Sequence, residues 1–198
     1  MGSEERTPFR VGFVTGATPD KWARIWRERR PGTPLALVPL TEAAQEAALR
    51  DGSVDMALVR LPVDRSGLHL IPLYDEVSVV VVARDHVVSA YDEIALADLA
   101  DEQFVLPPPE GFVPRAGQLT FPPMSEREAL EVVASGTGVV VLPLSVARLL
   151  HRKDVVHRPV SGVEQTTVGL AWLVGRDDEP IQAFIGIVRG RTNRSSRG

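Results

Sequence analysis

SEREALEVVASGTGVVVLPLSVARLL, residues 125–150, is the stretch that most directly predicts the fold. Ser125 and Glu128 have the spacing of a capping box, in which each side chain accepts a backbone N–H hydrogen bond at the start of a helix. Apolar residues at helical spacing continue until Gly136, and residues 139–142 then run without a polar side chain, as in a strand covered on both faces in a parallel sheet. Ser145 stands where it can cap a further helix. The stretch therefore predicts a helix, a buried strand and a helix, which form one part of an α/β domain.

The N-terminal third of the chain predicts a parallel sheet. Residues 9–14, 35–40 and 56–59 are short runs typical of strands, and the segments between them have helical spacing. Thr18, which a proline follows, and Thr41 stand where the N-caps of these helices are expected. An order of strand, helix, strand, helix and strand implies right-handed crossovers and parallel strands.

The composition is that of an ordinary globular protein. The 198 residues are 44% hydrophobic and 24% charged, and the net charge of -4 argues against nucleic-acid binding by the folded body. The absence of cysteine excludes disulfide bonds, thiolate catalysis and cysteine metal sites. The first residues, MGSEERTPFR, contain no apolar signal core, and no apolar run approaches the ~20 residues that a membrane helix needs. We therefore expect a cytoplasmic protein.

The glycine and proline spacing of residues 125–150 resembles that of the effector-binding domain of LysR-type transcriptional regulators. In that family a helix is followed by V-x-x-G-x-G, an apolar strand, L-P and S-x-A. Further similarities occur in the family's order over roughly residues 9–189, and include an R-x-G start, an L-x-x-G-x-x-D-x-A-L segment and an L-x-D-L helix. They are carried by Arg10, Gly12, Pro34, Leu35, Leu37, Leu49, Gly52, Asp55, Ala57, Leu58, Gly67, Leu68, Arg84, Asp85, His86, Leu96, Asp98 and Leu99.

This resemblance implies an α/β fold of two Rossmann-like lobes with a cleft, as in type 2 periplasmic binding proteins. We expect lobe 1 to comprise residues 9–81 and 163–189 and lobe 2 to comprise residues 82–162. Residues 190–198 carry only positive charge and are expected to form a disordered basic tail.

Two features depart from the family pattern. The sequence begins at the effector domain, so we expect no N-terminal winged helix-turn-helix and no element that enters a DNA major groove. Residues 107–123 are rich in proline, which makes the helix that the family places there improbable. The second lobe is therefore expected to be abbreviated.

Hydroxyl and small residues follow the first two strands, at the position where a periplasmic-binding-protein fold binds its ligand. Free N–H groups at helix N-termini and the carboxyl ends of strands suit an anion there, typically a carboxylate. The candidate residues are Thr15, Gly16, Ala17, Thr18 and Thr41. Simple helix capping is the alternative for Thr18 and Thr41.

Arg60 follows the third strand directly, where its guanidinium could bind a carboxylate through two hydrogen bonds. A salt bridge to Asp64 or Asp75 is the alternative. By resemblance, Leu106, Pro107 and Ser125 would form the facing wall from the second lobe. Two neighbouring apolar residues, Phe121 and Met124, would add cover there.

The sequence gives little support for catalysis. The four histidines lie far apart without metal-ligand spacing. Ser145 is not in a G-x-S-x-G elbow, and no G-x-G-x-x-G or P-loop motif is present. We therefore expect no enzyme activity, no metal and no cofactor.

We interpret the chain as an effector-binding domain similar to that of LysR regulators, binding a small organic anion and forming a side-by-side homodimer. Three alternatives remain open, namely a solute-binding protein, an enzyme on the same fold, and a stand-alone protein-interaction module with a degenerate cleft. The basic tail could contact DNA only weakly, through phosphates, and such binding would fade steeply with salt.

Overall fold

The computed structural model describes residues 7–190, which form two compact units. Unit 1 combines residues 7–74 with residues 167–190, and unit 2 comprises residues 75–166. From the sequence we expected the chain to leave the first lobe after residue 81 and to return to it at residue 163. The basic tail was expected over residues 190–198, and all of it except Gly190 lies outside the described part of the chain.

Unit 1 is built on a five-stranded sheet in the order β2-β1-β3-β9-β4. As the sequence predicted, β1 runs parallel to both β2 and β3, whereas β9 is antiparallel to β3. The strands are β1 (Phe9–Val14), β2 (Leu35–Leu40), β3 (Met56–Arg60), β4 (Leu68–Glu76) and β9 (Thr166–Leu173). All five residues of β3 are buried, as expected of a strand in the centre of a covered sheet.

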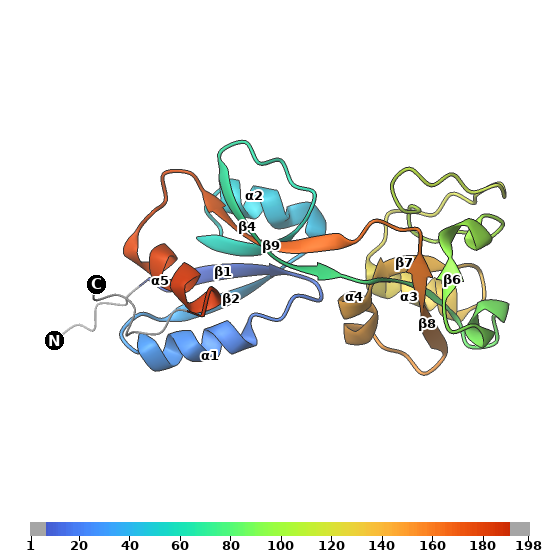
Figure 1. The fold of residues 1–198 in the computed structure, drawn as a ribbon, viewed down its shortest axis with the longest axis horizontal. Coiled ribbons are helices and arrows are strands. Elements are labelled where there is room, and N and C mark those ends of the chain that lie inside the picture. Colours follow the sequence, from blue (N-terminus) through green and yellow to red (C-terminus); the bar gives the residue numbers. More distant parts are fainter. Residues whose placement is uncertain (1–6, 191–198) are drawn as a thin grey trace. The chain divides into compact units, whose positions relative to one another are not determined.

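Helices α1 (Asp20–Arg29) and α5 (Glu179–Val188) contribute to one hydrophobic core with the sheet of unit 1, and α2 (Gln45–Arg50) contributes to a second (Figure 1). The first core centres on Trp26, whose ring lies 5.0 Å from that of Phe9 and 5.9 Å from that of Phe184. A short 3₁₀ turn, η1 (Glu42–Ala44), precedes α2.

Two predicted caps of unit 1 are wrong. Helix α1 begins one residue later than expected, with Pro19 in the N-cap position and no side-chain capping bond, so Thr18 lies outside the helix. Thr41 is the N-cap of η1, but its hydroxyl makes no capping bond. Both threonines are exposed, and water can satisfy the first turn without them.

Unit 2 is built on a four-stranded sheet in the order β6-β8-β5-β7. Its strands are β5 (Ser78–Ala83), β6 (Ile94–Ala95), β7 (Val140–Pro143) and β8 (Val155–Ser161), and its 3₁₀ turns are η2 (Val87–Ala90) and η3 (Leu96–Leu99). Contrary to the parallel pairing expected around residues 139–142, β5 is antiparallel to both β7 and β8. Strand β7 alternates buried and half-buried residues, as antiparallel strands often do.

The capping box is present as predicted. Helix α3 (Glu126–Ala134) begins after Ser125, whose Oγ accepts from the Glu128 N–H while the Glu128 carboxylate accepts from the Ser125 N–H. The cap assigned to Ser145 is wrong, because helix α4 (Leu144–Leu149) starts before it and its hydroxyl donates to the buried Glu76. That bond spans 69 positions, so no local pattern could reveal it.

The glycine after α3 has a steric reason. A Cβ atom at Gly138 would lie 2.2 Å from the carbonyl oxygen of Gln103, well inside contact distance. This approach lets Val139 pair with residues 103–105, since its N–H donates to Gln103 and its carbonyl accepts from Val105. Residues 107–123 contain no helix, as their prolines predicted.

Candidate functional site

In unit 1, Arg60 joins the loops that follow β1 and β2. It is the last residue of β3 and only 3% of its side chain is exposed. Its Nη2 donates to the carbonyl oxygen of Thr15 over 3.0 Å, and its Nη1 donates to Glu42 Oε2 over 3.3 Å. The loops bearing Thr15 and Thr41 are therefore held at the same edge of the sheet as Arg60, where the carboxyl ends of parallel strands meet.

The backbone of Arg60 is fixed by a second buried side chain. The Arg60 N–H donates to Gln45 Oε1 over 2.8 Å, and Gln45 Nε2 donates to the Arg60 carbonyl over 2.9 Å. Gln45 is buried, and both the oxygen and the nitrogen of its side-chain amide are hydrogen-bonded in the interior. Sequence reasoning did not identify Gln45 or Glu42. The signal available was their position, just after the strand that neighbours β1.

The alternative of an Arg60–Asp64 salt bridge does not match the structure, in which Arg50 Nη2 binds Asp64 over 3.1 Å. Glu42, with a half-exposed side chain, pairs with Arg60. The Glu42 carboxylate keeps half of its surface in solvent, so water screens the charge of the pair and limits its contribution to stability. Arg60 thus already makes a carboxylate contact of the kind that the sequence assigned to a ligand.

Four of the unit 1 candidates, residues 15–18, lie in one short segment at the end of β1, and Thr41 directly follows β2. Gly16 has φ +89°, a left-handed conformation that favours glycine, and Ala17 closes the turn by donating to the Val14 carbonyl over 3.0 Å. Thr15 is half-buried and Thr18 exposed, and within residues 7–190 neither hydroxyl makes a hydrogen bond. The turn can therefore offer hydroxyl groups beside a buried cation.

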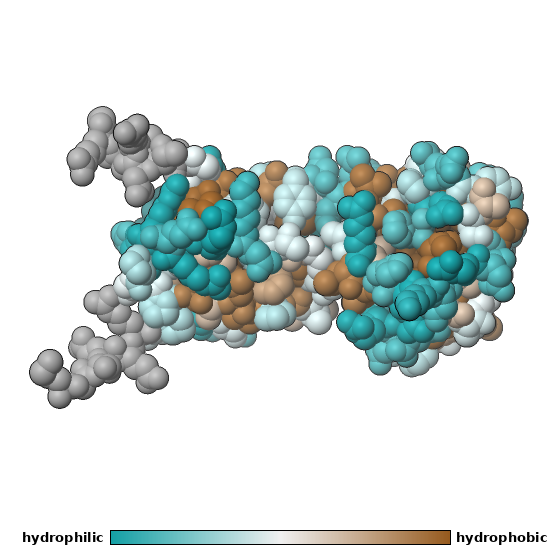
Figure 2. All heavy atoms as spheres, turned by 90° about the horizontal axis from the view of Figure 1, so that it is seen from below, coloured by the Kyte–Doolittle hydropathy of each residue, from teal (hydrophilic) through white to brown (hydrophobic). Residues whose placement is uncertain are grey.

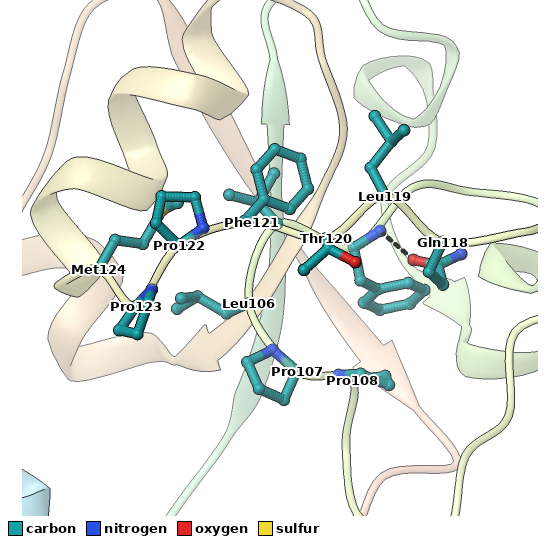
Figure 3. Close-up of a pocket in the computed structure, with 12 residues that line it drawn as sticks. Leu106, Pro107, Pro108, Gln118, Leu119, Thr120, Phe121, Pro122, Pro123 and Met124 are labelled. Atoms are coloured by element: carbon teal, nitrogen blue, oxygen red, sulfur yellow. Dashed lines mark hydrogen bonds between the residues drawn. The ribbon is translucent and has the colours of Figure 1, made fainter.

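Unit 2 contains a cavity of about 580 Å³ beneath the proline-rich loop (Figure 3). Leu106 and Pro107, which the sequence analysis assigned to the wall of a cleft, line this cavity, and so do Phe121 and Met124. Ser125 is not among the lining residues, because its side chain serves the capping box. The cavity wall is predominantly apolar, which suits the hydrocarbon part of a small ligand.

Two amide side chains help to attach the loop that covers this cavity, since Gln103 Oε1 accepts from the Leu119 N–H over 2.8 Å and Gln118 bonds back to residues 102–104. Gln118 Oε1 accepts from the Phe104 N–H over 2.8 Å, and Gln118 Nε2 donates to the Glu102 carbonyl over 3.0 Å. Figure 3 shows Gln118 and Thr120 at the end of the cavity away from Met124. In the described part of the chain the Thr120 hydroxyl has no hydrogen-bond partner, so it is free to bind a ligand at this end.

Two of the four histidines, His69 and His86, have structural positions. His69 packs on Trp172 with a ring separation of 5.2 Å, and His86 accepts from the Val88 N–H at the start of η2. Among residues 7–190, no three metal-ligating side chains lie together. Neither does any helix within that range have the length and apolar character that crossing a bilayer requires.

Comparison with known proteins agrees with the resemblance seen in the sequence. The profile of the LysR substrate binding domain matches residues 2–120. The Hca operon transcriptional activator HcaR of Escherichia coli is 28% identical, with the alignment covering 95% of this chain and 69% of that protein. The regulator ShiR of Corynebacterium glutamicum is 31% identical over 81% of this chain and 59% of its own length, and AlsR of Bacillus subtilis is 25% identical over 83% and 58%. These relatives are transcriptional regulators rather than enzymes.

Solved structures show the same fold. The BenM effector binding domain with its effector benzoate superposes with a TM-score of 0.75 at 21% identity, covering 96% of both chains. An OxyR regulatory domain from Pseudomonas aeruginosa gives 0.70 at 24% identity, covering 93% of this chain and 96% of that one. The chain has the type 2 periplasmic-binding-protein-like fold, and it belongs to the LysR substrate binding domain family as an effector-binding domain.

Proposed function

We propose that this domain binds a small organic acid with an apolar body as the effector of a LysR-type transcriptional regulator. The observation that carries the proposal is the cavity of unit 2, whose volume of about 580 Å³ falls within the range of small-molecule sites. Its wall is largely apolar, and Thr120 and Gln118 add polar groups at one end. A ring or short alkyl chain would bury apolar surface there at roughly 25 cal/mol per Å².

A second, separate part of the proposal concerns unit 1 alone and assigns a position for a carboxylate to the region around Arg60. The loops at that edge of the unit 1 sheet contain the candidate residues Thr15, Gly16, Ala17, Thr18 and Thr41. Arg60 supports an anion there by its positive charge and by holding Thr15 in place. The BenM domain was solved with its effector benzoate, so benzoate is a reasonable first probe of this chemistry.

The proposal extends to regulation and assembly. An effector can shift a conformational equilibrium only through its different affinity for the two states. The domain is expected to form a homodimer, as LysR regulators form oligomers, and light scattering with and without ligand measures this directly.

Binding is tested by calorimetry with a panel of small carboxylates, each paired with its neutral amide, for example benzoate with benzamide. We expect saturable binding of at least one acid and much weaker binding of its amide. A ligand at 100 times its dissociation constant adds about 2.7 kcal/mol to the free energy of unfolding, which a thermal shift detects. If no acid in a broad panel binds at millimolar concentration, the proposal is wrong.

A bulky substitution tests the cavity itself. Thr120→Trp places a large side chain in the cavity at an exposed position, so we expect affinity to fall at least tenfold with little loss of stability. Thr137→Trp, at another exposed threonine of unit 2, is the matched control and should leave affinity unchanged. Equal effects of the two substitutions would exclude this cavity as the binding site.

A further inference from the structure

A second cavity of unit 2, of about 410 Å³, is lined mainly by polar atoms and is bordered by α4, β5 and β8. Its charged lining residues are Arg148 from α4, His157 and Arg158 from β8, and Asp92. None of them lines the apolar cavity beneath the proline-rich loop. Two arginines and a histidine therefore border one cavity together with a single carboxylate.

The guanidinium of Arg158 is fixed without an acidic partner. It donates to the backbone carbonyl oxygens of Ser89, Tyr91 and His157, the last over 2.9 Å. No carboxylate within residues 7–190 lies at ion-pair distance from Arg158 or from Arg148. Backbone carbonyls orient a guanidinium but do not neutralise it, so its full positive charge remains to act on the cavity.

The charge of the two arginines affects the pKa of His157. Partial burial, followed by the positive charges of Arg148, Arg158 and His151, lowers the pKa of His157. At neutral pH its ring is therefore neutral, and the cavity holds the charges of two arginines against that of Asp92. An anion seated there would reverse the effect, since a nearby negative charge favours the imidazolium form.

We propose that this cavity is a binding site for a dianionic phosphate group, separate from the proposed organic-acid site. A single carboxylate is satisfied by one guanidinium through two hydrogen bonds, whereas a phosphate offers more acceptor oxygens and a second negative charge. The ligand is free phosphate or the phosphate of a small monoester, which share this chemistry.

The test is a titration of the isotope-labelled protein with inorganic phosphate, followed by NMR and matched in ionic strength with sodium chloride. We expect saturable shifts at Arg148, His157 and Arg158 that chloride does not produce. A parallel titration with glycerol phosphate identifies the source, because a monoester ligand binds more tightly than inorganic phosphate and a free-phosphate site does not. Shifts no larger than those with chloride, for both probes, would overturn the proposal.

Charge variants make the test specific. Arg148→Gln removes an exposed side chain of the cavity and should weaken phosphate binding at least fivefold, whereas Arg127→Gln, an exposed arginine of α3, should change it less than twofold. Asp92→Asn should tighten binding. Equal effects of the two arginine substitutions would show general electrostatic attraction and exclude a site.

The histidine provides an independent readout. Sulfate stays dianionic across the titration of His157, so saturating sulfate should raise the pKa of His157, and its affinity should increase as the pH falls. Arg148, Arg158 and His151 act on this ring, and Asp92 lines the same cavity, so the same spectra follow the signals of these four residues as well. An unchanged His157 pKa in saturating sulfate would contradict the assignment.

Discussion

The two units hold their candidate residues by different means. In unit 1, Arg60 is buried and fixed by Gln45, Glu42 and Thr15 through hydrogen bonds that the interior cannot replace. In unit 2, the apolar cavity lies beneath a loop without a helix, attached in part by polar side chains that solvent reaches, among them Gln118 and Gln103. The position of Arg60 is thus tied to the stability of its unit, whereas the loop of unit 2 can vary in sequence at little cost.

The two units do not differ in the general polarity of their surfaces. Figure 2 shows hydrophobic residues scattered among hydrophilic ones on both units, on the face that it draws. The contrast between the units therefore lies in how specific side chains are attached rather than in general polarity. Three substitutions test this contrast.

The largest effect is expected for Gln45→Leu in unit 1. The substitution leaves the buried N–H and carbonyl of Arg60 without partners, and each unsatisfied group costs about 1–3 kcal/mol. We expect a loss of roughly 2–4 kcal/mol in the free energy of unfolding, measured by urea denaturation. Gln182→Leu, at an exposed position of α5, is the control and should cost less than about 0.5 kcal/mol. A loss below 1 kcal/mol for Gln45→Leu would show that Arg60 is not held as described.

A smaller effect is expected for Gln118→Ala in unit 2. The amide is exposed, so water replaces its hydrogen bonds and the loss should be about 1 kcal/mol. Hydrogen exchange at the Phe104 N–H should nevertheless accelerate, because that group loses its partner. A loss as large as that of Gln45→Leu would abolish the contrast between the units.

The smallest effect on stability is expected for Glu42→Gln, because half of the Glu42 side chain is exposed and the charge of such a pair contributes about 0–1 kcal/mol. Its effect on binding is more informative. Removing the charge that pairs with Arg60 should strengthen the binding of an organic acid several-fold, as calorimetry measures. Unchanged or weaker binding would separate Arg60 from the acid group and assign it a positioning role.

Local patterns in the sequence predicted the local structure well. The capping box of Ser125 and Glu128, the parallel strands β1 to β3 and the absence of a helix in residues 107–123 depend on neighbouring residues, and all are present. Two errors are local, since neither Thr18 nor Thr41 makes a capping bond. The others, the direction of β7 and the partner of Ser145, depend on residues distant in sequence. Ser145 reads as a cap but donates to Glu76.

In the candidate sites, too, some features were predictable from local sequence and others depend on distant contacts. The position of Arg60 at the end of a strand was predictable from the run of apolar residues before it. Its partner Glu42 was not, since the pairing depends on how β1 places its neighbours side by side. The apolar cavity depends on a bond between Gln118 and Phe104, which lie apart in sequence. The second cavity depends on α4 and β8, which bring Arg148 and Arg158 together and whose packing is not visible in the sequence.

The discontinuity of unit 1 has a consequence for how this protein can change. Residues 75–166 are inserted between β4 and β9, which are adjacent strands of one sheet. Because both ends of this insertion are attached to adjacent strands, recombination between related genes could replace residues 75–166 as one segment and leave the sheet of unit 1 intact. New ligand preferences could then arise by transplantation as well as by gradual substitution.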